Sequence, residues 1–141
     1  MPFSKVDPSI RKQIKELSLT YSDRPQPELL MAVPNPHPGV DYTDTLTYPE
    51  FTSLCPLAPS QPDYATITFE YSPHDWIVEL KSLKFYLVSF RTVEIFHEAV
   101  AGQILKDLIE LVKPKWARVT EEVTTRGGIQ TTVNAWYDKE E

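Results

Sequence analysis

The chain of 141 residues is 41% hydrophobic and 24% charged, an ordinary composition for a globular protein of one domain. Its formal net charge of -6 argues against nucleic acid as the main partner, because neutralising phosphates requires a basic surface. No apolar run approaches the roughly 20 residues of a membrane span, and the first residues lack a signal-peptide pattern. One cysteine cannot close an intramolecular disulfide. We therefore expect a cytoplasmic protein.

The N-terminal 40 residues are expected to form a proline-rich extension of a single domain that spans residues 41–141. A short helix is predicted to begin with Asp7 as its N-cap and Pro8 in its first turn, because three apolar residues then recur with helical spacing. Five prolines crowd the following stretch, where each one fixes φ and removes an N–H donor. Residues 28–33 between these prolines are the candidate for an edge strand.

The middle of the chain has the pattern of strands. Residues 42–54 are rich in Thr, Tyr and Phe and predict a strand. The three prolines of residues 56–62 predict a loop, and residues 64–71 then alternate as a half-buried strand does. Residues 72–75 are expected to turn the chain, so that residues 76–79 pair back on the preceding strand as a hairpin.

Two helices and a second hairpin are predicted to follow. Residues 80–91 carry apolar side chains on one helical face, and residues 94–113 form the longest periodic segment, which a proline ends. Two strands, residues 116–125 and 129–137, are joined by Arg126-Gly127-Gly128, where glycine supplies positive φ. Two antiparallel hairpins with both helices on one face of the sheet predict an α+β sandwich.

Cys55 and Asp63 are the first candidates for chemistry. A cysteine thiol has a pKa of about 8.5 and attacks as the thiolate, so a nucleophilic cysteine needs a nearby base or positive field. Cys55 lies between a strand and a proline-rich stretch, where a side chain is held yet reachable, although free cysteines are more often buried small apolar residues. Asp63 is either a general acid or a turn residue.

Four charged residues and a histidine form the second set of candidates. Glu79 precedes a helix, where a carboxylate can bind the edge of a flat heterocycle or simply begin the helix. Lys81 and Lys84 share a helical face that suits phosphate or is merely solvated. His97 and Glu98 lie in the first turns of the longer helix, where a histidine is more often structural than catalytic.

Metal and Rossmann-type sites have little support in the sequence. The chain has no CxxC or HxxxH pattern, and its three histidines are scattered, so we expect no metal. A Walker A or GxGxxG fingerprint is also absent. A dinucleotide would therefore have to bind without a Rossmann unit.

Six short motifs, in this order and at this spacing, resemble the QueF family of NADPH-dependent nitrile reductases. They are residues 51–56 (FTSLCP), 61–63 (QPD), 79–86 (ELKSLKFY), 89–91 (SFR), 96–98 (FHE) and 126–128 (RGG). The resemblance implies the tunnelling fold (T-fold), with the order ββααββ, in its short type of one module per chain. It also implies a homo-oligomer of stacked rings, a decamer, with active sites between subunits.

The resemblance implies the reduction of 7-cyano-7-deazaguanine to the 7-aminomethyl compound by NADPH, in the biosynthesis of queuosine, a tRNA modification. Cys55 matches the nucleophile that forms a covalent thioimide, and Asp63 matches the proton donor. The residues that match the substrate-binding positions are Val78, Glu79, Leu80, His97 and Glu98. Those expected at the cofactor are Leu80, Lys81, Lys84, Arg126 and Gly127, with some of them supplied by a neighbouring copy.

The stretch between Cys55 and Asp63 departs from the family pattern. It is one residue longer than usual and has a proline where the family has its glycine turn. Two other functions also remain open on the residues alone. A thiol-dependent hydrolase would hydrate the same thioimide instead of reducing it, and a T-fold module without catalysis would only bind the heterocycle.

Overall fold

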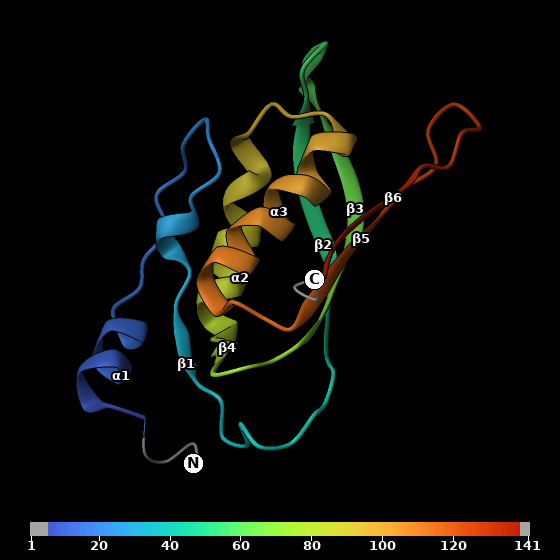
Figure 1. The fold of residues 1–141 in the computed structure, drawn as a ribbon. Helices are drawn as coiled ribbons and strands as arrows, with labels where there is room; N and C mark the ends of the chain where they lie inside the picture. Colours follow the sequence, from blue (N-terminus) through green and yellow to red (C-terminus); the bar gives the residue numbers. More distant parts are fainter. Residues whose placement is uncertain (1–5, 139–141) are drawn as a thin grey trace.

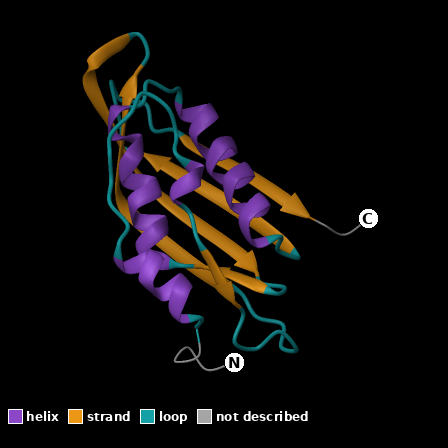
Figure 2. Cartoon of the chain, turned by 90° about the vertical axis from the view of Figure 1, so that its left-hand side faces the viewer, coloured by secondary structure: helices purple, strands orange, loops and turns teal. Residues whose placement is uncertain are grey.

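The computed structural model describes residues 6–138, and its centre is an antiparallel sheet of four strands in the order β2-β3-β5-β6. The strands are β2 (Asp44–Cys55), β3 (Ala58–Ser72), β5 (Trp116–Val123) and β6 (Thr132–Asp138). Between the two hairpins lie α2 (Leu80–Val88) and α3 (His97–Val112), and both helices cover the same face of the sheet (Figures 1 and 2). The predicted α+β sandwich with the order ββααββ is therefore confirmed.

Alternation along β3 and β5 sorts their side chains between the two faces of the sheet, because successive residues of a strand point in opposite directions. On the helix-covered face, Ile67, Phe69 and Val119 are at most 2% exposed. On the open face, Tyr64 and Trp116 of these strands and Trp136 of β6 remain exposed. No helix within residues 6–138 covers this open face, and none of the described helices is long and apolar enough to cross a membrane.

The helix α3 forms because its apolar residues recur every four positions and all face the sheet. Val100, Ile104, Leu108 and Val112 are fully buried. The helix ends at Lys113, which adopts a left-handed conformation with φ 47° and is followed by a proline. It begins at His97, three residues later than predicted, because residues 94–96 are extended beside the end of β2.

The helix α2 is shorter than predicted, and a 3-10 turn, η3 (Ser89–Thr92), continues it. Its apolar face is buried as expected, and Phe90 at its end packs against Phe51 of β2 with ring centroids 5.3 Å apart. The hydroxyl of Tyr86 donates a hydrogen bond of 2.5 Å to Asp107 of α3. Burial raises the pKa of Tyr86, so it stays protonated and links the two helices.

The predicted hairpin between residues 64–71 and 76–79 is wrong. The strand β4 (Trp76–Val78) pairs instead with β1 (Ala32–Pro34), which belongs to the N-terminal extension. The reason is that β3 already has β2 on one side and β5 on the other, so it has no free edge for β4. The hydroxyl of Tyr71 on β3 accepts the N–H of Val78, which fixes β4 against the main sheet.

The prolines of residues 56–62 do not form the predicted loop, because β3 begins at Ala58 and includes two of them. Pairing of β3 with β5 starts only at Ala65, so this part of β3 has one partner strand, and fewer of its N–H groups are needed for pairing. The register with β2 shifts between Leu54, which faces Pro62, and Cys55, which faces Ala58. The stretch that is one residue longer than the family pattern therefore contains an irregularity in strand pairing next to Cys55.

The described part of the N-terminal extension, residues 6–40, packs onto the domain. Its helix α1 (Pro8–Lys15) has the predicted cap, with Asp7 accepting the N–H of Ser9 at 2.7 Å. Residues 28–33, predicted as a strand, divide between a 3-10 turn, η2 (Pro27–Leu29), and the start of β1. Leu30 and Val33 are buried in the core.

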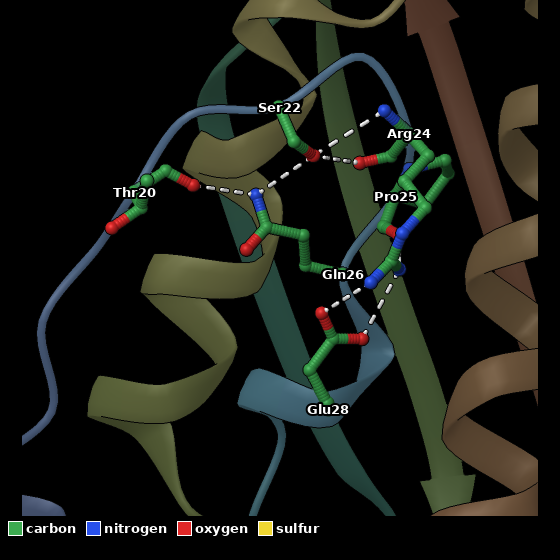
Figure 3. A network of polar contacts seen from close by, with 6 residues as sticks. All are labelled: Thr20, Ser22, Arg24, Pro25, Gln26 and Glu28. Atoms are coloured by element: carbon green, nitrogen blue, oxygen red, sulfur yellow. Dashed lines mark hydrogen bonds and ion pairs between the residues drawn. The ribbon is translucent and has the colours of Figure 1, made fainter.

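A network of hydrogen bonds links residues 20–28 of the extension (Figure 3). Arg24 donates to both carboxylate oxygens of Glu28, and the buried Gln26 donates to the carbonyl of Thr20 at 2.8 Å. The Arg24–Glu28 pair is exposed and stabilises little by itself. The hydroxyl of Thr92 in η3 donates to the carbonyl of Ser22, which ties this turn to the end of the α2 segment.

Candidate active site

Cys55 is held at the end of β2 and its side chain is half-buried and free of any disulfide. The neighbouring Leu54 donates its N–H to Val93 and accepts the N–H of Ile95, with distances of 2.9 and 3.1 Å. The end of β2 is therefore fixed between β3 and the segment that leads into α3. This placement agrees with the prediction of a thiol that is positioned by the backbone and still reachable.

Asp63 of β3 lies beside the end of β2 that carries Cys55. It pairs directly with Ser53, which lies two residues before Cys55, and the register of the two strands shifts between Leu54 and Cys55. The predicted nucleophile and the predicted acid thus lie in the same region of the β2–β3 pair.

Arg126 contacts Asp63 within the same chain. Its guanidinium donates to the carboxylate of Asp63 at 2.7 Å and to the carbonyl of Pro62 at 3.1 Å. The predicted tight turn over Gly127 and Gly128 is confirmed, since both have positive φ and Arg126 pairs with Ile129 across them. The sequence favoured the supply of Arg126 by a neighbouring copy, whereas the fold places it at its own chain's acid.

His97 lies between two carboxyl groups at the start of α3. Its Nε2 atom is 3.8 Å from Asp63 Oδ2, and its Nδ1 atom is 3.7 Å from Glu121 Oε2. Both distances exceed a hydrogen bond, but contacts of this kind often shorten when a catalytic site binds its substrate. Glu98 follows on the same helix and remains exposed.

Glu121 is the member of this group that the sequence analysis missed. Its side chain is 1% exposed, and neither carboxylate oxygen has a hydrogen-bond partner among residues 6–138. Burial, followed by the negative charges of Glu98 and Asp63, raises the pKa of Glu121 to about 8. The alternation of β5 contained the signal, because Glu121 falls in the core-facing series of Ala117, Val119 and Val123.

Glu79, Leu80 and Lys81 lie at the other end of the molecule. They begin α2 beside β4, whereas η3 and the end of β2 lie beyond the opposite end of this helix (Figure 1). With a rise of about 1.5 Å per residue, the nine residues of α2 separate the two groups by roughly 13 Å. Within one chain, the fold does not bring Val78, Glu79 and Leu80 to the site of Cys55.

The start of α2 differs from the predicted anion site. Glu79 caps the helix with its own carboxylate, which accepts the N–H groups of Lys81 and Ser82 at 3.0 and 2.7 Å. These N–H groups are therefore already bonded to an anion. The ammonium group of Lys81 donates to the carbonyls of Ile14 and Lys15 at the end of α1.

Two further features of this end bear on ligand binding. Lys84 is exposed and, like Lys81, has its ammonium group within 6 Å of the ring of Phe85, at 5.4 and 5.6 Å. Leu80 and Lys84 also line an apolar groove of about 360 Å³ between α2 and β2.

Among the described residues, no cluster of three or more His, Cys, Asp or Glu side chains could hold a metal ion.

Comparison with known proteins gives three concordant similarities. The sequence model of the QueF family, described as QueF-like protein, matches residues 62–141, a range that begins after Cys55. The NADPH-dependent 7-cyano-7-deazaguanine reductase of Chloroherpeton thalassium is 49% identical over 115 residues, which are 82% of this chain and 98% of that protein. The enzyme of the same name from Ruegeria pomeroyi is 52% identical over 109 residues, 77% of this chain and 70% of that protein.

Among solved structures, the apo form of the archaeosine synthase QueF-Like superposes with a TM-score of 0.62 at 26% sequence identity. The alignment covers 67% of this chain and 91% of that one. This neighbour agrees with the T-fold expected from the order of the elements.

Proposed function

Because the chain belongs to the QueF family, we propose that it acts on its nitrile substrate through a covalent bond to Cys55. The protein is an NADPH-dependent 7-cyano-7-deazaguanine reductase, an oxidoreductase of queuosine biosynthesis. The observation that supports the covalent mechanism is the position of the half-buried Cys55 at the end of β2, two residues beyond the direct partner of Asp63, with Arg126 and His97 beside that acid.

The first step joins the substrate to the protein. The S–H bond of Cys55 breaks, its sulfur bonds to the nitrile carbon, and the proton ends on the nitrile nitrogen, which gives a thioimide. A nitrile is a poor electrophile, and the thioimide accepts hydride more readily. Arg126 and the paired strands hold Asp63 in place, and we assign Asp63 as the acid that serves this nitrogen.

Two protons must then reach the same nitrogen. After the first hydride has reached the carbon, Asp63 protonates the nitrogen, and the carbon–sulfur bond breaks to return the Cys55 thiol and leave an imine. A second hydride and a second proton complete the aminomethyl product. In this scheme, Asp63 gives up a proton twice in each turnover.

Substrate binding is assigned to two groups of residues. His97 and Glu98 lie at the start of α3, where His97 is beside Asp63. The exposed carboxylate of Glu98 is assigned to accept two N–H groups from the edge of the deazaguanine ring. Val78, Glu79 and Leu80, which lie at the other end of α2, complete the pocket from a neighbouring chain. Each oxygen of Glu79 already accepts one backbone N–H but has a further lone pair for a ligand.

NADPH supplies both hydrides when it is bound. The residues present fit such a group, because Lys84 is exposed beside an apolar groove whose size suits a ring and whose edge carries positive charge. Lys81 would bind phosphate once its ammonium group leaves the carbonyls of α1. Leu80, Arg126 and Gly127 complete the proposed cofactor-binding set.

The separation of the two groups supports an active site shared between subunits. Glu79 and Cys55 lie at opposite ends of α2, so one pocket needs the first group from one chain and the second from another. The open face and the edges of β2 and β6 leave room for such contacts. We include in the proposal a ring-shaped homo-oligomer, a decamer, an N-terminal extension of residues 1–40, and a cytoplasmic location that keeps Cys55 reduced.

Mass spectrometry of the protein mixed with 7-cyano-7-deazaguanine, without NADPH, tests the covalent mechanism. The wild-type protein should gain the mass of one substrate per chain, while Cys55→Ala should gain none and lose turnover entirely. Asp63→Asn serves as the matched variant, because it keeps the thiol and should form the adduct but not reduce it. Turnover by Cys55→Ala near the wild-type rate would refute the mechanism, and ammonia release without NADPH oxidation would identify a hydrolase.

A further inference from the structure

We propose that Glu121 stores the proton that His97 passes to Asp63 between the two reduction steps. This inference rests on the proposed function, since it supplies the acid of that reaction with its second proton. Glu121 is then a positioning residue that acts through His97 and does not touch the substrate.

The first argument is the environment of Glu121. Buried carboxyl groups almost always have hydrogen-bond partners, yet both oxygens of this side chain lack one among the described residues. Its carboxyl group points from the core-facing side of β5 toward the start of α3, where His97 Nδ1 lies 3.7 Å away. A fold gains no stability from an ionisable acid placed in this way.

The second argument is alignment. The ring of His97 faces Glu121 with one nitrogen and Asp63 with the other, at 3.7 and 3.8 Å. Imidazole can accept a proton at one nitrogen and release a proton from the other. A small rotation of the ring or of either carboxyl group would bring both contacts to hydrogen-bond length.

The third argument is the number of protons that the reaction needs. Asp63 has one carboxyl group and holds at most one proton to donate, whereas the reaction needs two after the thioimide has formed. In the proposed transfer, the O–H bond of Glu121 breaks as an N–H bond forms at His97 Nδ1. The N–H bond at His97 Nε2 then breaks as an O–H bond forms on Asp63, and solvent reprotonates Glu121 after product release.

Burial and the neighbouring charges keep the carboxyl group of Glu121 protonated at neutral pH. The groups that face Glu121 are Asp63 from β3, His97 and Glu98 from α3, and, beyond Asp63, Arg126 from the β5–β6 turn. Burial together with the two neighbouring carboxylates raises its pKa to about 8, so most copies carry a proton at pH 7. Above about pH 8 most copies of Glu121 have lost this proton, so the second reduction should slow.

Glu121→Gln tests the proposal, because glutamine keeps the shape of the side chain but has no acidic proton. In stopped-flow measurements of NADPH oxidation, the first phase should keep its rate and the second should slow by about tenfold or more. The wild-type second phase should decline as pH rises through 8, and the variant should lose this dependence. Glu121→Asp should restore part of the rate, and Glu122→Gln, on the open face of the same strand, should behave like wild type.

An infrared measurement provides a readout without turnover. The wild-type protein should show the band of a protonated carboxyl group that disappears as pH rises through 8, and Glu121→Gln should lack it. Equal second phases in wild type and Glu121→Gln, or no such band, would overturn the proposal. Failure of wild type to form the Cys55 adduct would instead refute the proposed function, so the two failures are distinguishable.

Discussion

The carboxyl group of Glu121 lies inside the protein near two other acids, so its ionisation opposes folding. Its pKa is about 8 in the folded chain and near 4.5 when the side chain is exposed. A raised pKa means that the folded state holds the proton more tightly than the unfolded state. The associated stability is complete below about pH 4.5 and is lost as pH rises through 8.

Replacing this acid by glutamine should therefore stabilise the protein in a pH-dependent way. Each unit of pKa shift corresponds to about 1.4 kcal/mol, so Glu121→Gln should gain on wild type by an amount on the order of a few kcal/mol between pH 5 and 9. Thermal unfolding of both proteins at several pH values measures this difference. A constant difference from pH 5 to pH 9 would show that Glu121 is not a buried, titrating acid.

The contact between α2 and α3 shows how single polar groups position whole elements. Tyr86 and Asp107 are both buried, and their hydrogen bond is surrounded by apolar side chains of the core. Gln103 also donates to both oxygens of Asp107, so this carboxyl group is well satisfied as long as Tyr86 is present. This link joins α2 to α3, the helix that begins at His97.

Removing the hydroxyl group should weaken the fold without changing its shape. Tyr86→Phe leaves a buried acceptor of Asp107 with fewer donors, which should cost about 1–3 kcal/mol of unfolding free energy. Urea unfolding measures this loss, and Tyr64→Phe on the open face is the control, with an expected change within about 0.5 kcal/mol. A loss for Tyr86→Phe no greater than for the control would show that the hydrogen bond contributes nothing.

Local patterns predicted those elements whose side-chain periodicity is visible in the sequence. The four-residue repeat from Val100 to Val112 and the alternation of β3 were sufficient to predict a helix and a strand. The partner of β4 could not be predicted, because pairing depends on which edges of distant strands are already occupied. The prolines of residues 56–62 also misled, since proline is compatible with a strand that lacks one neighbour.

The candidate site shows the same division. Motif order led to Cys55, Asp63, His97 and Arg126, and the fold brings the last three into direct proximity. The pairing of Arg126 with its own chain and the unbonded state of Glu121 depend on side chains from separate strands. Such contacts follow only from the tertiary arrangement.

At the scale of the whole molecule, the proposed site residues fall into two groups at opposite ends of α2, here called half-sites. One half-site contains Cys55, Asp63, His97 and Arg126, and the other contains Glu79 with the two lysines. A pocket that uses both half-sites needs two copies of the chain. This geometry predicts which pairs of inactive variants should regain activity when their subunits are mixed.

Inactive Cys55→Ala and Glu79→Ala subunits should regain activity when they are dissociated, mixed and reassembled. One pocket in such an oligomer combines an intact Cys55 from one chain with an intact Glu79 from the other. Cys55→Ala mixed with Arg126→Ala is the matched control and should stay inactive, because Arg126 serves the Asp63 of its own chain. Recovery in the control mixture, or none in the first mixture despite proven mixing, would contradict this division.

The tryptophans on the open face give the protein an optical property of its own. Trp136 is 70% exposed on the edge strand β6, and Trp116 lies near it on β5, both outside the group around Cys55. Indole fluoresces at shorter wavelength when water is removed from around it. Emission should therefore shift to the blue when subunits associate through this edge or face and stay unchanged when substrate reacts with Cys55. Assembly could then be followed by its native fluorescence, without a dye and independently of the chemistry.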